Sequence, residues 1–308
     1  MPVKVADGLP AIGILEKEGI FLMTENRAQH QDIRPIKLAI LNLMPTKMET
    51  ETQLLRLLSN TPLQLQIDFV QTATHEAKHV PHEHLRAFYK TFDQIKDERY
   101  DGMIITGAPV EKIPFEEVDY WPELCKIMEW SKTNVYSVLH ICWGAQAALF
   151  YHYGIPKHML SKKLCGIFAH RPLVPSHPLM RGFDDVFYAP HSRYTEVRAA
   201  DIEKVPELVL LANSPDTEVN IVANRNGRQF FATCHLEYDR YALAREYNRD
   251  VERGLKVEVP KNYFPNDDPK QRPMVQWRGH AELFYTNWLN YYVYQETPYD
   301  LSSLSYSK

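Results

Sequence analysis

The sequence predicts an α/β fold, a doubly wound and mostly parallel sheet with helices on both faces. Short apolar runs alternate with segments of helical spacing through the first half of the chain, as in β-α-β-α proteins. One apolar run, at residues 135–141, passes directly into a helical segment, which is typical of a sheet whose strand ends carry a site. With 308 residues, 44% of them hydrophobic, the chain can bury a large core, and we expect one domain over residues 1–308.

The first half should hold the parallel part of this sheet. Residues 1–35 are expected to form an irregular N-terminal arm that ends at Pro35. Apolar or alternating runs predict strands at 36–44, 63–70, 100–106 and 135–141. Helical spacing of apolar residues predicts helices at 46–59, 82–92, 120–132 and 145–151.

The second half is richer in strands. Apolar runs predict strands at 163–168, 185–189, 208–212, 219–223 and 229–233. A helix is predicted at 239–253, a proline-rich loop at 259–272 and an aromatic-rich helix at 279–294. No linker separates these elements, so we expect the residues from about 239 to 308 to form a C-terminal helical extension of the same domain.

Composition argues against several classes of protein. The net charge of −4 does not fit a nucleic-acid binder, which normally carries a basic excess. No apolar stretch approaches the ~20 residues of a membrane span, and the N-terminus lacks the apolar core of a signal peptide. The four cysteines show neither metal-type pairing nor a disulfide framework. We therefore expect a cytoplasmic protein with no metal, nucleic-acid or membrane partner.

The segment His140-Ile141-Cys142-Trp143-Gly144 predicts a nucleophile elbow. A sharp turn from strand to helix would lift the sulfur of Cys142 above the sheet edge, where the helix dipole and free N–H groups favour thiolate over thiol. Gly144 suits this turn because a side chain there would crowd it. A lone cysteine at a strand end is otherwise a small buried hydrophobe, but the elbow context favours the nucleophile.

A possible base and its acidic partner, His235 and Glu237, follow the predicted strand at 229–233. If the strand continues that far, alternation points both side chains to the same face. Glu237 could then orient the imidazole and stabilise its protonated form, which completes a Cys–His–Glu relay. The residues alone leave open a core histidine and a surface carboxylate.

Other candidates are less specific. The turn Thr106-Gly107-Ala108-Pro109 could offer the backbone N–H of Gly107 to an oxyanion, beside the amide of Trp143, or it could be an ordinary turn. The segment Pro190-His191-Ser192-Arg193-Tyr194 is rich in hydrogen-bonding groups, although a polar surface loop would look the same. Spacing alone leaves Lys163 and Arg249 as solvated charges.

Together these motifs cover nearly the whole chain and are long enough to be specific. They include Leu41-Asn42-Leu43-Met44-Pro45, Ile105-Thr106-Gly107-Ala108-Pro109-Val110-Glu111, Glu117-Val118-Asp119-Tyr120-Trp121, the elbow, Pro190-His191-Ser192-Arg193 and Asn287-Trp288-Leu289-Asn290-Tyr291-Tyr292. In these motifs the chain closely resembles the homoserine O-acyltransferase family of methionine biosynthesis. The resemblance implies a flavodoxin-like sheet similar to that of class I glutamine amidotransferases, which share the cysteine elbow and the His-x-Glu.

The resemblance also implies roles for single residues. Cys142 would carry the acyl group as a thioester, with His235 as general base and Glu237 as its partner. Lys163, Ser192 and Arg249 match positions that contact substrate, and an arginine fork suits the carboxylate of homoserine. A homodimer is implied by the family alone. We expect no cofactor, with acetyl-CoA serving as co-substrate.

Glu111 bears on the choice of acyl donor. In the family that the chain resembles, a glutamate here accompanies acetyl-CoA and a glycine accompanies succinyl-CoA. Two like charges ~4 Å apart repel by ~4 kcal/mol at an effective dielectric of ~20, so Glu111 would oppose a succinyl carboxylate. We therefore expect acetyl transfer from acetyl-CoA to L-homoserine, giving O-acetyl-L-homoserine, with succinyl transfer as the main alternative.

Two other classes of function remain open. A glutaminase or related amide hydrolase would use the same three residues, but it would normally pass ammonia to a synthetase domain that this chain does not obviously contain. A non-catalytic binding protein that kept the fold is the second alternative.

Overall fold

The computed structural model describes residues 3–17, 23–24, 34–74, 80–298 and 300–304. Within these residues twelve strands form one continuous sheet in the order β2-β1-β4-β3-β6-β7-β12-β11-β10-β8-β9, with β5 paired to β4. The strands are β1 (Val3–Val5), β2 (Met23–Thr24), β3 (Ile36–Leu41), β4 (Leu65–Gln71), β5 (Tyr89–Thr91), β6 (Tyr100–Ile105), β7 (Val135–Ile141), β8 (His158–Pro172), β9 (Phe187–Glu196), β10 (Leu208–Ser214), β11 (Glu218–Asn224) and β12 (Gln229–Ala232).

The sheet changes from parallel to antiparallel at β12. From β2 to β12 every neighbouring pair is parallel, including β3 with β6, β6 with β7 and β7 with β12. Beyond β12, the pairs β12–β11, β11–β10, β10–β8 and β8–β9 are antiparallel. The predicted α/β sheet is therefore confirmed, and its antiparallel part is the strand-rich second half of the chain.

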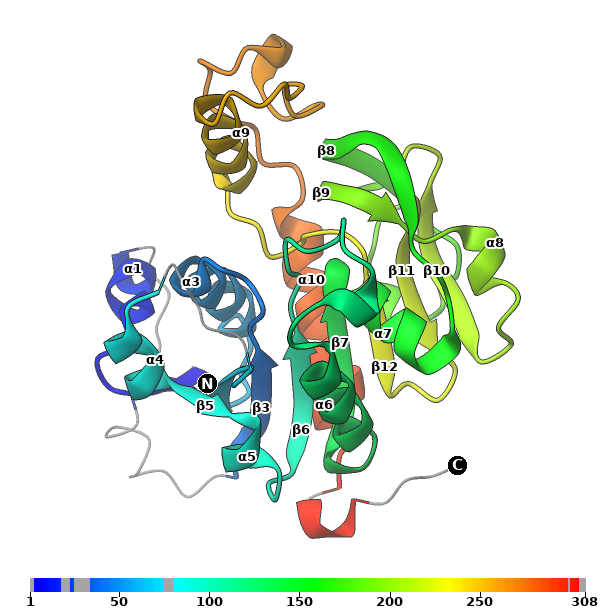
Figure 1. Cartoon of the computed structure of the whole chain (residues 1–308). Coiled ribbons are helices and arrows are strands. Elements are labelled where there is room, and N and C mark those ends of the chain that lie inside the picture. The colour runs from blue at the N-terminus through cyan, green and yellow to red at the C-terminus, as the bar shows by residue number, and fades with distance from the viewer. Residues whose placement is uncertain (1–2, 18–22, 25–33, 75–79, 299, 305–308) are drawn as a thin grey trace.

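Helices cover both faces of the parallel strands (Figure 1). The longer helices are α1 (Ala11–Lys17), α3 (Lys47–Leu58), α4 (His82–Phe88), α6 (Trp121–Asn134), α7 (Trp143–Tyr153), α9 (Ala242–Glu252) and α10 (Arg278–Trp288). Leucines of α3 and aromatic residues of α10 pack with Ile40 and Ile104 in one buried cluster. Apolar residues of α6 and α7 pack with Leu41 and Ile105 in the other. Adjacent residues of one strand thus face opposite layers, as the period of two in a strand requires.

Helix α9 occupies a different position from the helices that cover the sheet. It stands near the ends of β8 and β9, on the side of the molecule where the central strands end, opposite α3 (Figure 1). Shorter helical segments include α5 (Phe92–Ile95), α8 (Ala199–Ile202) and the 3₁₀ turns η1 (Phe115–Glu117), η2 (Pro178–Met180), η3 (Pro265–Asp267) and η5 (Leu301–Ser303).

The N-terminal segment is not irregular where the structure describes it. Strand β1 pairs with β4, β2 pairs with β1, and Leu15 of α1 is fully buried. Residues 1–2, 18–22 and 25–33 of the predicted arm lie outside the described residues. The prediction failed because three-residue strands carry too few side chains to show a pattern.

The helix predicted at 82–92 is also wrong at its end. Tyr89 leaves the helix and begins β5, which pairs with β4. The hydroxyl of Tyr89 donates a 2.6 Å hydrogen bond to the buried carboxylate of Glu51 on α3. This contact lies 38 residues away in the chain, so local spacing could not reveal it. The predicted helix at 279–294 is similarly divided into α10 and a π-helical turn, η4 (Leu289–Tyr294).

The segment from Pro190 to Tyr194 is a strand and not a loop. It lies in the middle of β9, which pairs antiparallel with β8 from His158 to His170. Both strands are longer than predicted, because their polar residues have partners inside the protein that a sequence pattern does not show. Alternation along β9 places Ser192 and Tyr194 at a cleft, whereas His191, Arg193 and Thr195 are fully buried.

Candidate active site

The junction of β7 and α7 is a strained turn centred on Cys142. Its φ of 50° and ψ of −115° lie where non-glycine residues are rare, and such strain costs on the order of 1–3 kcal/mol. The turn is held by the N–H of Cys142, which donates to Ala232 O at 2.7 Å. Helix α7 begins at the next residue, so its N-terminus points at the sulfur. The predicted sharp turn from strand to helix at Cys142 is therefore present.

Gly144 is required by the close approach of α7 to the end of β6. A Cβ at this position would stand 2.5 Å from Thr106 O and 2.9 Å from Ile105 O, both of them backbone atoms. Gly107 lies just beyond them, where a Cβ would be 3.2 Å from Cys142 Cβ and 3.6 Å from His235 Cε1. The turn after β6, the elbow and the histidine therefore converge on one point.

This convergence follows from the order of the strands. Strands β3, β6, β7 and β12 are consecutive and parallel, so their carboxyl ends form one edge. Four segments follow these ends, and ligands of open α/β sheets bind at such an edge. The residues concerned are Leu43–Pro45 after β3, Gly107–Pro109 after β6, Cys142 after β7 and His235 after β12.

His235 and Glu237 form a buried pair. His235 Nδ1 lies 2.6 Å from Glu237 Oε1, and both side chains are less than 8% exposed. The imidazole also lies near Cys142, because Cys142 Cβ and His235 Cε1 are 3.2 and 3.6 Å from the same point beside Gly107. Burial alone would lower the pKa of His235, but the charges of Cys142 and Glu237 hold it well above its usual value. The imidazole thus has Glu237 as its hydrogen-bond partner and Cys142 as its neighbour.

The pairing arises by a route other than strand alternation. Strand β12 ends at Ala232, and the chain turns at His235, whose carbonyl accepts from Tyr238 N at 3.2 Å. Pro190 O of β9 accepts from His235 N at 2.9 Å and fixes the turn from the other side. The strand therefore does not continue to His235, although the two side chains do meet.

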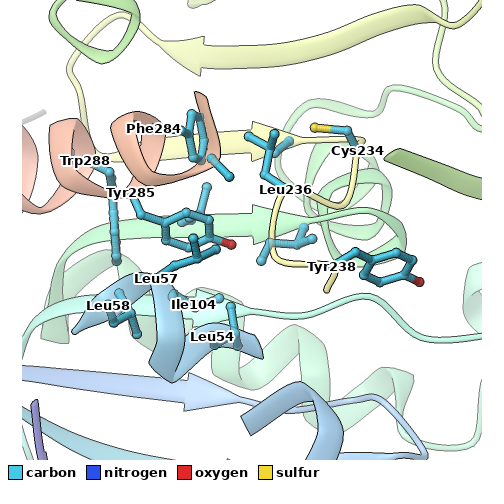
Figure 2. Close-up of a cluster of buried hydrophobic side chains, with 14 of the residues drawn as sticks. Leu54, Leu57, Leu58, Ile104, Cys234, Leu236, Tyr238, Phe284, Tyr285 and Trp288 are labelled. Atoms are coloured by element: carbon cyan, nitrogen blue, oxygen red, sulfur yellow. The ribbon is translucent and has the colours of Figure 1, made fainter. Parts of the chain in front are cut away.

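Apolar contacts anchor the turn that carries His235. Cys234 and Leu236 belong to the buried cluster that also contains Phe284 and Tyr285 of α10 (Figure 2). Tyr238 stacks on His235, with ring centroids 4.2 Å apart and an angle of 18° between the planes. Since rings in a packed core cannot reorient freely, these contacts restrict the imidazole to one position.

A cleft of about 720 Å³ opens in front of Cys142 and His235. One wall comes from the residues after β3 and β6 and from α3, and the other from β8, β9 and α9. The predicted site side chains line it with the exception of Glu237, together with residues that were not predicted. The lining includes Glu111, Cys142, Lys163, Ser192, Tyr194, His235, Tyr238, Arg245, Glu246, Arg249 and Asp250.

Lys163, Ser192 and Arg249 meet two carboxylates on one wall of this cleft. Ser192 Oγ donates to Glu246 Oε2 at 2.5 Å, and Lys163 Nζ lies 3.3 Å from the same oxygen. Lys163 also reaches Asp250 Oδ2 at 3.2 Å, and the guanidinium of Arg249 donates to Asp250 Oδ1 at 3.0 and 2.9 Å. The three predicted residues, far apart in sequence, therefore lie together.

The protonation states in this network follow from the charges. Burial would lower the pKa of Lys163, but Glu246, Cys165 and Asp250 raise it to about 12. Burial would raise the pKa of Asp250, but hydrogen bonds and charges from Arg249 and Lys163 leave it below its usual value. The wall consequently presents fixed cations and at least one fixed anion at neutral pH.

Glu111 stands between this wall and the turn after β6. Its Oε1 accepts from the backbone N–H of Tyr194 at 3.3 Å, which holds the carboxylate against β9. On the other side of Tyr194, Lys112 Nζ lies 3.6 Å from the centroid of its ring. Glu111 is therefore held inside the cleft that contains Cys142.

Arg193 lies behind the cleft, on the buried face of β9. Its guanidinium is fully buried and donates to Thr195 O at 2.6 Å and Thr217 O at 2.7 Å. Burial lowers its pKa, whereas the charge of Cys142 raises it. A buried cation held by neutral carbonyls is costly unless an anion lies nearby, and Cys142 is one group that can supply it.

Three residues with contacts in the site, Tyr238, Glu246 and Asp250, were missed in the sequence. Glu246 accepts hydrogen bonds from Ser192, from Lys163 and, at 2.8 Å, from the hydroxyl of Tyr238. Glu246, Arg249 and Asp250 are spaced three and four residues apart, so they share one face of α9. That spacing could have revealed a polar face, but it could not distinguish a solvated face from a site wall.

Neither a metal cluster nor a membrane span is found in the described part of the chain. Among these residues, no three or more His, Cys, Asp or Glu side chains come together in a way that could hold a metal ion. Across the same residues, no helix has the length and apolar character to cross a bilayer.

The sheet topology and the site define a class of α/β proteins in which a cysteine elbow at a strand end faces a histidine and an acid. Solved structures show the same fold at low sequence identity. A glutamine amidotransferase from Methylobacillus flagellatus has a TM-score of 0.52 and 15% identity, over 84% of this chain and 95% of its own. A glutamine amidotransferase from Thermotoga maritima has a TM-score of 0.53 and 12% identity, over 83% and 98%.

Sequence comparison is more specific. The family model for homoserine O-succinyltransferase matches residues 2–299, and the chain belongs to this family. A homoserine O-acetyltransferase from Acetivibrio thermocellus is 61% identical over 99% of this chain and 100% of its own length. Proteins of the same name from Bacteroides fragilis and Methanomassiliicoccus intestinalis are each 57% identical, over 99% and 100% of this chain and all of their own lengths. The predicted family and fold are confirmed.

Proposed function

We propose that this protein is a homoserine O-acetyltransferase, which moves the acetyl group of acetyl-CoA to the hydroxyl of L-homoserine through a thioester on Cys142. The observation that carries the proposal is the Cys142–His235–Glu237 chain, which opens into a cleft walled by fixed charges. The full-length similarity to proteins named homoserine O-acetyltransferase supports the same reaction.

The first half-reaction forms the thioester. The thiolate of Cys142 attacks the carbonyl carbon of acetyl-CoA, a C–S bond to the enzyme forms, and the C–S bond to CoA breaks. We expect the backbone N–H groups of Gly107 and Trp143 to stabilise the oxyanion. His235 in its protonated form gives its proton to the departing CoA thiolate, and the charge of Glu237 supports that form.

The second half-reaction consumes the thioester. Now neutral, His235 takes the proton of the homoserine hydroxyl, whose oxygen attacks the acetyl carbon and releases Cys142 as thiolate. O-acetyl-L-homoserine leaves and His235 is again protonated, which returns the site to its starting state. Stacking of Tyr238 on the ring keeps the imidazole oriented through both halves.

Lys163, Ser192 and Arg249 form the expected homoserine subsite. In the free protein their polar groups contact Glu246 and Asp250. The zwitterion can exchange with these contacts, because its carboxylate suits the cations and its ammonium suits the carboxylates. The subsite thus recognises both charges of an amino acid.

Glu111 supports acetyl over succinyl transfer. Held against the N–H of Tyr194 in the cleft, its carboxylate would face the second carboxylate of a succinyl group. At ~4 Å the repulsion is ~4 kcal/mol for an effective dielectric of ~20. Glu111→Gly should therefore improve the use of succinyl-CoA relative to acetyl-CoA in steady-state assays with both donors. An unchanged ratio would contradict the donor assignment.

Intact-mass spectrometry tests the central proposal. The wild-type protein mixed with acetyl-CoA should gain one acetyl group, lose it when homoserine is added, and yield O-acetylhomoserine. Cys142→Ala should gain none, whereas Cys125→Ala, a matched change at a second cysteine, should behave as wild type. Incubation with glutamine addresses the amide-hydrolase alternative raised by the structural similarity. An adduct or ammonia release with glutamine, without acetylation, would refute acetyl transfer.

Assembly and compartment follow the same proposal. We expect a homodimer in the cytoplasm, where a reducing environment keeps the nucleophilic thiol free. Acetyl-CoA and homoserine are then its only small-molecule partners, with no resident cofactor.

A further inference from the structure

A second hollow, of about 420 Å³, adjoins the cleft in front of Cys142. The two are neighbours that share five lining residues: Met44, Pro45, Pro109, Val110 and Ile113. The second hollow extends from these residues to the ends of β3 and β4 and to η1, away from α9. Its volume lies within the ~300–1,000 Å³ typical of small-molecule sites.

The two spaces differ in chemistry. The cleft beside α9 contains Lys163, Glu246, Arg249 and Asp250, and it suits a zwitterion. Toward η1 the walls are mainly apolar, with a few uncharged polar groups that could bond to amides. The apolar residues there are Leu43, Met44, Val110, Ile113 and Val118 with two prolines, and the uncharged polar residues are Gln71, Thr72 and Tyr120. The charged residues are Glu117, Asp119 and the buried Lys47, whose Nζ donates to Asn42 O.

The walls of the second hollow are fixed before any ligand arrives. After β4, the carboxylate of Glu123 accepts from Ala73 N at 2.9 Å and from Thr74 N at 3.0 Å. After β3, Leu43 N donates to Thr106 Oγ1 at 2.8 Å. Since the loops are tied to α6 and β6, little ordering entropy would be lost on binding.

We propose that this second hollow binds the pantetheine arm of the acyl-CoA donor. The inference rests on the proposed function, because it needs a CoA thioester at Cys142. The sulfur of CoA must leave the elbow along the cleft, and the way toward α9 is lined with charges that the neutral arm cannot satisfy. The other way offers apolar contact for the dimethyl group and hydrogen-bonding partners for the two amides.

Acidic residues at the rim of the hollow indicate that it binds the pantetheine arm and not the nucleotide of CoA. Glu117 and Asp119 border the hollow, and their charge has the same sign as that of the nucleotide phosphates. The phosphates therefore lie outside this part of the surface. Val110, which lines both spaces, precedes Glu111, so one loop contacts the arm and the acyl group together.

Filling the hollow tests the assignment. Leu43 and Gln71 line it without lining the cleft, and neither is fully buried, so Leu43→Trp and Gln71→Trp place bulk in the hollow and not in the core. Leu173→Trp is the matched control, because Leu173 is 46% exposed and lines neither space. Each variant is first checked for folding by circular dichroism and by its urea midpoint.

The measurement is the rate of Cys142 acetylation, followed by intact mass, with acetyl-CoA, S-acetylpantetheine and S-ethyl thioacetate. Both filling variants should lose at least tenfold with acetyl-CoA and S-acetylpantetheine and stay within twofold of wild type with S-ethyl thioacetate, which has no arm. Leu173→Trp should match wild type with all three donors, and the KM for homoserine should not change in any variant.

Three results would overturn the assignment. They are wild-type rates with acetyl-CoA in both filling variants, an equal loss with all three donors, and a loss with acetyl-CoA alone, which would place the nucleotide in the hollow. Failure of the proposed function looks different, because wild-type protein would then gain no acetyl group from acetyl-CoA while S-ethyl thioacetate still reacted.

Discussion

The contact between α7 and β6 predicts a specific cost for one methyl group. In Gly144→Ala, the new Cβ would lie 2.5 Å from Thr106 O and 2.9 Å from Ile105 O, whereas real Cβ contacts stay above 3.0 Å. The start of α7 must therefore move by at least 0.5 Å, the difference between 3.0 and 2.5 Å, because both neighbours are backbone atoms of a central strand. Overpacking of this kind costs ~1–3 kcal/mol of unfolding free energy.

The same movement should impair the chemistry. Cys142 is two residues away, and Gly107 follows the strand end that α7 would push against. A misplacement of ~1 Å can cost on the order of 10²-fold in rate, so half of that should cost at least roughly tenfold. The rate of Cys142 acetylation by acetyl-CoA, measured by intact mass, checks this value, and urea denaturation measures the stability.

Gly279→Ala is the matched control for this prediction. Gly279 also occupies the second position of a helix, α10, but outside its own helix and chain neighbours no atom lies within 4 Å of the point where a Cβ would stand, and its φ is not positive. The substitution should be neutral or stabilise by up to ~1 kcal/mol through the unfolded chain. The reasoning would be refuted if Gly144→Ala kept the wild-type rate and stability, or if Gly279→Ala lost as much.

Substitutions at three further residues probe the network around Cys142. Glu237→Gln should lower turnover by ~10²–10⁴-fold, as expected for a general base that loses its partner. The pKa of His235 is raised in the folded protein, so the pairing of His235 with Glu237 stabilises the fold below pH 6.5. This stabilisation is lost as the pH rises through the raised pKa. The urea midpoints of wild type and Glu237→Gln should therefore converge at high pH. Tyr238→Phe keeps the ring that stacks on His235 but removes the hydrogen bond to Glu246. The KM for homoserine should therefore rise by roughly tenfold, or ~1.4 kcal/mol, while the rate of Cys142 acetylation stays the same. A fall in the acetylation rate alone would argue against separate roles for the ring and the hydroxyl. Arg193→Met removes a buried positive charge near Cys142, so iodoacetamide should alkylate the thiol more slowly at neutral pH and Arg193→Lys should recover part of the rate; equal rates in all three proteins would exclude the charge effect.

The elbow could be predicted because its signals are contiguous. Val135 to Gly144 contains a strand, a cysteine and the start of a helix in one short run. Only the need for glycine at position 144 depends on a distant segment, because a Cβ there would meet the carbonyl oxygens of Ile105 and Thr106. The same is true of the parallel strands, whose apolar runs are buried on both sides. Local pattern and tertiary structure agree for these elements.

The misread elements depend on distant partners. The sequence of β9 is polar, and its residues Arg193 and His191 can be buried because they bond to Thr217 and His170, which lie 24 and 21 residues away. A sequence pattern counts such residues as exposed, and only their hydrogen bonds make burial tolerable. Glu246 was missed for the same reason, since Ser192 precedes it by 54 residues.

The charge balance of the cleft predicts that the acetyl acceptor must carry both an ammonium and a carboxylate group. Lys163 and Arg249 are already neutralised by Glu246 and Asp250, so an incoming ligand must replace contacts as well as form them. Homoserine can replace both kinds of charge, whereas 4-hydroxybutyrate has the same hydroxyl and carboxylate but no ammonium. With the cations taken up by its carboxylate, at least one of Glu246 and Asp250 would lose a partner, and an unpaired polar group costs ~1–3 kcal/mol, or roughly 10–100-fold in kcat/KM. Steady-state rates of deacetylation of acetylated Cys142 by the two alcohols measure this ratio directly. In Glu246→Gln the preference for homoserine should shrink, and an unchanged preference there would show that the ammonium is recognised by other groups.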